Sequence, residues 1–123
     1  MQKIKTMKNN YQDALSLINW VKEMNLNTLD LSNLQLTELP EKLLELSNLI
    51  QLNLSGNQLS SLPPSVALLQ NLAILKLTDN AFDDIPLFLS CLHMLRQLEF
   101  SRNPLRRLES SQSSKHKKRN KHC

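Results

Sequence analysis

The feature that most constrains this chain is a 23-residue repeat of leucines. Aligned at that spacing, four segments begin at Leu26, Leu49, Leu72 and Leu95, and the fourth breaks off partway. Leucine fills the fourth position of every segment, and leucine or phenylalanine fills the sixth and the eleventh. Such regularity predicts an array of similar units, in which no unit buries its own leucines and stacking creates the core.

A column of asparagines accompanies the leucines. The ninth position holds Asn57, Asn80 and Asn103 in the last three segments, whereas the first segment has Leu34 there. An asparagine side chain bonds well to turning backbone, so this column predicts a ladder of amides between repeats. Because Leu34 interrupts the column, we expect the ladder to begin at the second repeat.

Each segment combines two local patterns. Alternating leucines such as Leu29 and Leu31 predict a short strand with one face turned inward. A proline follows at Pro40, Pro63 and Pro86 and restricts the backbone as the chain crosses to the other side of the unit. Beyond the proline, the apolar spacing becomes nearly helical.

These motifs resemble the leucine-rich-repeat family, in particular the 23-residue intracellular type with the pattern LxxLxLxxNxLxxLPxxLxxLxx, as in Ras-suppressor-like proteins. The resemblance covers roughly residues 26–108. It implies an α/β fold, a curved solenoid with short parallel strands on its concave side. It also implies a protein-binding role.

The sequence divides into three parts. We expect an N-terminal capping helix in residues 1–25 and a disordered basic tail in residues 109–123. Between them lie the repeats of residues 26–108, with units at 26–48, 49–71, 72–94 and a partial unit at 95–108.

The two ends of the array need covers, because an open solenoid exposes its terminal core. At the first end, Asn10 is the expected N-cap of a helix through about Met24, with Asp13 as its capping-box-like partner. Its expected apolar face comprises Ala14, Leu15, Leu17, Ile18, Val21 and Met24. At the other end three alternatives stay open: the partial repeat is its own cap, it is a self-association edge, or a longer array has been cut short.

The charge is concentrated near the C-terminus. Residues 1–95 contain six lysines against nine acidic residues, whereas residues 96–123 contain nine basic residues against two acidic ones. The basic tail residues are Lys115, Lys117, Lys118, Arg119 and Lys121. This composition predicts a solubilising disordered segment or, alternatively, a tether to nucleic acid or an anionic membrane, or a nuclear-targeting signal. No aromatic side chains interleave with these charges, which argues against specific reading of bases.

Several classes of site are disfavoured by composition. Gly56 is the single glycine, so a glycine-rich phosphate loop is excluded. The two cysteines, Cys91 and Cys123, make neither a disulfide framework nor a metal-ligand spacing, and we expect Cys91 to be a small core residue. With no cysteine-rich caps and no long apolar run, we expect a cytoplasmic protein, with the nucleus as the alternative.

Candidate catalytic residues are few. His93, His116 and His122 do not fall in a recognisable catalytic spacing, and the paired Asp83 and Asp84 are interpreted as solvated loop charges. We therefore expect no enzyme activity, no metal site and no cofactor.

A binding surface is better indicated. In a repeat of this kind, the third and fifth positions of each unit lie between inward leucines and face outward from the strands. These positions hold Thr28, Asp30, Gln51, Asn53, Ile74, Lys76, Gln97 and Glu99. A polar face of mixed charge with Ile74 near its middle is suited to a protein or peptide partner. The central residues of the predicted site are Asn53, Ile74 and Lys76.

Overall fold

The computed structural model describes residues 2–105, and the side chains from residue 10 onward. The expectations for Leu108, for the tail of residues 109–123 and for its basic side chains lie outside this range. One α-helix precedes four strands, and three 3-10 helices lie between the strands. The elements are α1 (Gln2–Glu23), β1 (Thr28–Asp30), η1 (Glu41–Glu45), β2 (Gln51–Asn53), η2 (Pro64–Leu68), β3 (Ile74–Lys76), η3 (Leu87–Cys91) and β4 (Gln97–Glu99).

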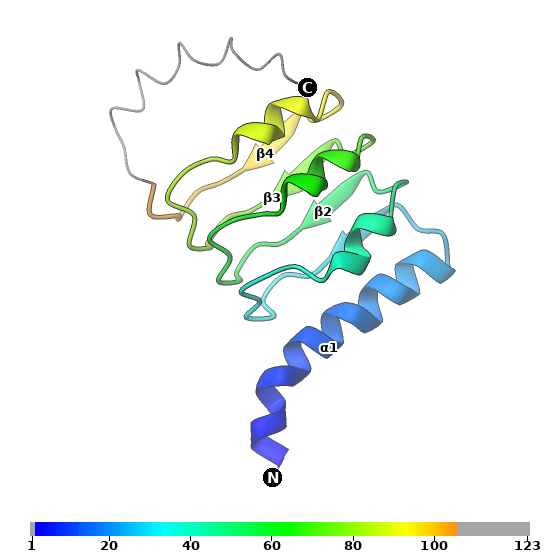
Figure 1. Cartoon of the computed structure of the whole chain (residues 1–123), viewed down its shortest axis with the longest axis vertical. Helices are drawn as coiled ribbons and strands as arrows, with labels where there is room; N and C mark the ends of the chain where they lie inside the picture. Colours follow the sequence, from blue (N-terminus) through cyan, green and yellow to red (C-terminus); the bar gives the residue numbers. More distant parts are fainter. Residues whose placement is uncertain (1, 106–123) are drawn as a thin grey trace.

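The four strands form one parallel sheet in the order β1-β2-β3-β4. Leu29 pairs with Leu52, Leu52 with Leu75 and Leu75 with Leu98, so the sheet register equals the sequence repeat. Figure 1 shows the strands stacked side by side along one side of the molecule and the 3-10 helices along the other. The expected α/β leucine-rich-repeat architecture is therefore confirmed.

Inward leucines of successive repeats make one continuous core. Leu52, Leu54, Leu75 and Leu77 are completely buried, because each has an equivalent side chain above and below it. Burying one such side chain stabilises the fold by about 1.5–3 kcal/mol. The alternate residues of each strand remain outside this core, as the period-two pattern predicts.

Proline starts each 3-10 helix. Pro40, Pro63 and Pro86 precede η1, η2 and η3 and have φ values of −66°, −68° and −58°. Their carbonyl oxygens accept the first i→i+3 bonds, from the N–H groups of Leu43, Val66 and Leu89. The spacing that is nearly helical in the sequence therefore folds as short 3-10 turns, a geometry common in such brief segments.

Asn57 binds the first repeat to the second. Its Oδ1 accepts bonds from the backbone N–H groups of Leu34 and Leu36, at 3.0 and 2.9 Å. Its Nδ2 donates to the carbonyl oxygens of Leu31 and Leu54, at 3.0 and 2.8 Å. The side chain is only 7% exposed, so these bonds satisfy an amide that water scarcely reaches.

The same pattern recurs in the next two repeats. Asn80 accepts a bond from Leu59 N–H, and Asn103 accepts one from Phe82 N–H, both at 3.0 Å. Each asparagine also donates back to the preceding repeat, Asn80 to Leu54 and Asn103 to Leu77. The ladder begins at the second repeat, as predicted.

A second set of asparagines links the repeats at the last position of each unit, just before the next unit begins. Asn48 Nδ2 donates to Asn25 Oδ1 at 3.3 Å, and Asn71 Nδ2 donates to the carbonyl oxygen of Ser47 at 3.2 Å. Met94 takes the equivalent position in the third repeat. Sequence reasoning missed this set, although the 23-residue spacing of Asn25, Asn48 and Asn71 is visible in the sequence.

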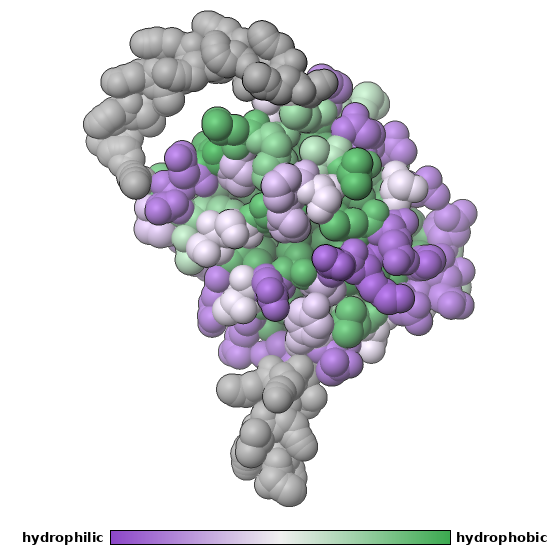
Figure 2. All heavy atoms as spheres, in the orientation of Figure 1, coloured by the Kyte–Doolittle hydropathy of each residue, from purple (hydrophilic) through white to green (hydrophobic). Residues whose placement is uncertain are grey.

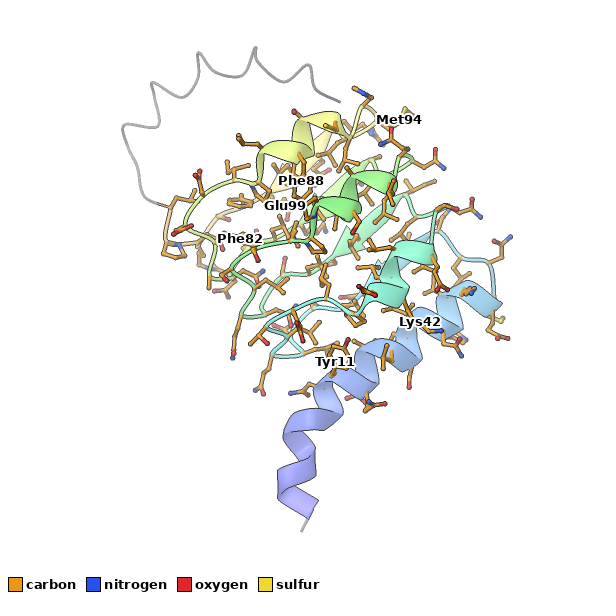
Figure 3. The ribbon with its side chains drawn as sticks, viewed as in Figure 1. Tyr11, Lys42, Phe82, Phe88, Met94 and Glu99 are labelled. Atoms are coloured by element: carbon orange, nitrogen blue, oxygen red, sulfur yellow. The ribbon has the colours of Figure 1, made fainter. Side chains whose placement is uncertain are left out.

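The helix α1 covers the first repeat. Ala14, Ile18 and Val21 are buried in the common core, and Tyr11 lies against it where the helix meets the first repeat (Figure 3). The helix begins at Gln2, well before the predicted N-cap, because no glycine or proline interrupts its first turns. Asn10 instead donates from Nδ2 to Gln35 Oε1 at 3.0 Å and so attaches the helix to the first repeat.

The buried stripe of α1 is narrower than the sequence indicated. Leu17 and Met24 belong to the predicted apolar face but are exposed, and Trp20 is also exposed. The buried residues Ala14, Ile18 and Val21 follow an i, i+4, i+7 spacing. This spacing places them in one narrow row along the helix, which packs against the first repeat.

An ion pair joins α1 to η1. Lys22 Nζ lies 2.8 Å from Glu45 Oε1, with both side chains about half exposed. The hydrogen bond between these side chains raises the pKa of Lys22 and lowers the pKa of Glu45. Because water screens the pair, it orients the helix more than it stabilises the fold.

Replacing Asn57 with alanine is the sharpest test of the ladder. We expect the free energy of unfolding to fall by about 1–3 kcal/mol, because Leu34, Leu36 and Leu31 lose a buried hydrogen-bond partner. The equivalent change Asn103→Ala is expected to cost less, since Asn103 is only half-buried. Urea denaturation measures both, and equal losses would contradict this account.

Candidate functional site

The eight predicted site residues lie together on one face of the sheet. We call this the outer sheet face, and its side chains form two rows across the strands. The strand register aligns Thr28, Gln51, Ile74 and Gln97 in one row and Asp30, Asn53, Lys76 and Glu99 in the other. The structure thus brings together all eight positions; their role in binding stays a prediction.

The centre of this face is more enclosed than the β1 edge, and at the β4 edge only Glu99 is also half-buried. Gln51, Asn53, Ile74 and Lys76 are half-buried, because β2 and β3 each have a strand on both sides. Adjacent strands in a sheet lie about 4.8 Å apart, so the aligned side chains of the two central strands are direct neighbours. Gln51, Asn53, Ile74 and Lys76 therefore form one contiguous patch.

Local turns use several of the acceptor atoms on this face. Asp30 Oδ1 accepts bonds from the backbone N–H and the hydroxyl of Ser32, at 2.9 and 2.6 Å. Asn53 Oδ1 accepts a bond from Ser55 N–H at 3.0 Å. These bonds close the turns just after β1 and β2 and hold the two acceptors in place.

Two hydrogen-bond donors at the centre remain available. Within residues 10–105, neither Lys76 Nζ nor Asn53 Nδ2 has a hydrogen bond or an ion pair to another described residue. The two residues are register partners on β3 and β2. Beside them, Ile74 supplies an apolar surface. The centre therefore offers donors and a small apolar contact.

The β4 edge of this face is occupied differently. Gln97 Nε2 donates to Glu99 Oε2 at 2.8 Å, so the two outward side chains of β4 pair along the strand. Glu99 lies beside Lys76 in the register but forms no ion pair with it among the described interactions. The carboxylate instead has a neutral donor.

Within residues 10–105, the side chains considered for catalysis do not assemble into a site; His116 and His122 lie outside this range. Asp83, Asp84 and His93 are exposed, and Cys91, expected in the core, is only half-buried at the end of η3. Among residues 2–105, no three His, Cys, Asp or Glu side chains are grouped so as to hold a metal ion. Across the same residues, no helix has the length and apolar character needed to cross a membrane.

Comparison with known proteins agrees with the geometry. A family model described as Leucine Rich Repeat matches residues 48–69. A solved leucine-rich-repeat protein of Leptospira interrogans superposes with a TM-score of 0.67 and 33% sequence identity. This chain is a leucine-rich-repeat protein. No curated protein matches its sequence.

The superposition covers unequal shares of the two chains. The superposition covers 80% of this leucine-rich-repeat chain but 25% of the Leptospira protein, so the chain spans about a quarter of that structure. Leucine-rich-repeat domains are typically non-enzymatic protein-interaction domains, and membership in the family indicates a protein-interaction module.

A stability comparison checks that the central donor is not structural. Lys76→Ala is expected to change the free energy of unfolding by less than about 0.5 kcal/mol, because the ammonium group has no partner among the described residues. Asp30→Ala is expected to cost about 1 kcal/mol, since it removes two turn bonds. Thermal melts of both variants test this, and a large loss from Lys76→Ala would contradict it.

Proposed function

We propose that this leucine-rich-repeat chain is a non-catalytic adaptor that binds a protein segment across its outer sheet face. The supporting observation is a pair of donors without a partner among the described residues, Asn53 Nδ2 and Lys76 Nζ, on register-paired residues next to Ile74. Donors of this kind favour a partner that supplies oxygen acceptors, and a lysine ammonium favours a carboxylate.

The proposed ligand is therefore an extended peptide segment with an acidic side chain next to an apolar one. Its carboxylate binds Lys76 and Asn53, and its apolar side chain covers Ile74. Because these residues are half-buried, binding desolvates the charge pair, and a pair of that kind contributes to affinity more than one at the rim. Asp30 and Glu99, at the two edges, disfavour ligands with further negative charge.

A double variant tests the proposed site. Ile74→Asp combined with Lys76→Glu reverses the charge and removes the apolar contact, so we expect capture of the partner to be lost. The partner is first identified by affinity capture from lysate and mass spectrometry, and its purified form is then titrated by calorimetry. Far-ultraviolet circular dichroism is expected to be unchanged.

The matched control makes the same chemical changes on the opposite side of the molecule. Leu68→Asp combined with Lys42→Glu alters two exposed side chains on η2 and η1. This control is expected to bind the partner with the affinity of the original chain. Unaltered binding by the folded Ile74/Lys76 variant would exclude the outer sheet face.

A second candidate function rests on the charge distribution. The excess of nine basic over two acidic residues in 96–123 favours an electrostatic tether to nucleic acid or an anionic membrane. We propose a cytoplasmic location for the adaptor, with the nucleus as the alternative if the same basic residues act as a targeting signal.

Removing residues 110–123 separates the two functions. Under the adaptor proposal, the shortened chain keeps its affinity for the protein partner, and that affinity depends only weakly on salt. Under the tether alternative, all binding is lost, and the binding of the full chain falls steeply between low and high salt. Titrations at two salt concentrations distinguish these outcomes.

A further inference from the structure

The two ends of the solenoid are covered to different degrees. At the first end, α1 keeps the inward leucines of β1 and its following loop buried. At the last end, Leu98 is 36% exposed and Leu105 is 45% exposed, although their equivalents in the preceding repeats are buried. Ile85 is 43% exposed, whereas Leu62 in the same position is 6% exposed. The core therefore opens at β4.

Aromatic packing covers only part of this end. Phe82 and Phe100 lie with ring centroids 5.3 Å apart, and Phe88 is half-buried beside the core (Figure 3). A different surface, the one formed by the 3-10 helices, also has apolar side chains among its polar ones (Figure 2). The most exposed leucines on η2 and η3 are Leu68 and Leu87.

The backbone of β4 has one free edge among the described residues. Gln97 N–H donates to Ala73, at 3.1 Å, and the Glu99 carbonyl oxygen accepts from Leu77 N–H, at 2.7 Å. Since alternate residues of a strand direct their polar groups to opposite sides, the N–H and C=O of Leu98 point away from β3. No strand within residues 2–105 pairs with that edge.

We propose that this edge binds a second copy of the chain, with the two β4 strands antiparallel about a two-fold axis at Leu98. In that arrangement the N–H and C=O of Leu98 bond reciprocally to those of the second copy's Leu98. The pair is self-complementary, as a two-fold interface requires. Leu98 of each copy then faces the other on the core side of the joined sheet.

The outward side chains of β4 match this orientation. An antiparallel pairing centred on Leu98 places Gln97 opposite the second copy's Glu99, twice over. Gln97 and Glu99 already form an amide–carboxylate bond within one chain at 2.8 Å, and the same groups bond across the axis without change of chemistry. A parallel pairing in register sets Glu99 against Glu99, which like-charge repulsion disfavours.

The covered opposite end limits the assembly to two copies. Within residues 2–105, α1 lies over the first repeat and one end, at β4, is open, so a two-fold pairing uses the open end of both copies. The joined molecule has a continuous sheet made of four strands from each copy. This pairing does not rest on the adaptor proposal, since it uses the backbone edge of β4 with Gln97 and Glu99, whereas the proposed ligand binds at Asn53, Ile74 and Lys76.

Sedimentation equilibrium of the full-length chain tests the pairing. We expect a monomer–dimer equilibrium whose dissociation constant responds to the charge at position 97. Gln97→Glu sets four carboxylates together and is expected to weaken the dimer about tenfold, whereas Gln97→Lys pairs each new ammonium with Glu99 and is expected to tighten it. The matched control Gln51→Glu makes the same change on β2, away from the edge, and is expected to have no effect.

A backbone variant tests the same edge without charge. Leu98→Pro removes the outward N–H but none of the bonds between β4 and β3, so we expect a folded monomer. Circular dichroism verifies that the fold is retained. If it is not, the three charge variants still decide the question.

Two outcomes overturn the proposal. One is a full-length chain that is monomeric up to about 0.3 mM, a concentration at which even weak specific pairs associate. In that case the residues after Leu105 are the remaining candidate for covering the edge. The other is a dimer whose dissociation constant is indifferent to both Gln97 substitutions, which would locate the contact elsewhere.

Discussion

The buried amide of Asn57 joins the backbone of the first repeat to that of the second. The backbone that turns after β1 has N–H groups with no partner in its own repeat, and the next repeat supplies their acceptor. Since Asn80 and Asn103 do the same one step further along, each repeat is completed by the one that follows it. The stacking of leucines and the bonding of turns therefore enforce the same 23-residue register.

That register determines what the outer sheet face offers a partner. Once the leucines occupy the core, the intervening side chains align in rows whatever their chemistry. In this chain the rows are distinguished by Lys76 and Asn53, whose donors have no partner among the described residues, and by Ile74 between polar neighbours. In the proposed function, binding is carried by side chains that the core does not need.

Much of the fold follows from the sequence because its period is so regular. The strand positions, the first rung of the asparagine ladder and the eight outward residues all derive from one alignment. The sequence did not predict where α1 begins. It also did not predict that Leu17 and Met24 are exposed or that Cys91 is only half-buried, because the burial of each side chain depends on the extent of the contact between packed elements. The sequence also does not show which polar atoms already have a hydrogen-bond partner. In Asn53, for example, Oδ1 accepts a bond from Ser55 N–H, whereas Nδ2 has no partner among the described residues.

Native-state hydrogen exchange reports on the asparagine ladder residue by residue. The amide protons of Leu34, Leu36, Leu59 and Phe82 have asparagine side-chain oxygens of the next repeat as their acceptors. We expect slow exchange at these four sites, with Phe82 least protected because it lies nearest to β4, the last strand of the sheet. Exchange at Leu34 and Leu36 at the rate of an unfolded chain would contradict this expectation, because those two turns would then have no bond to the second repeat.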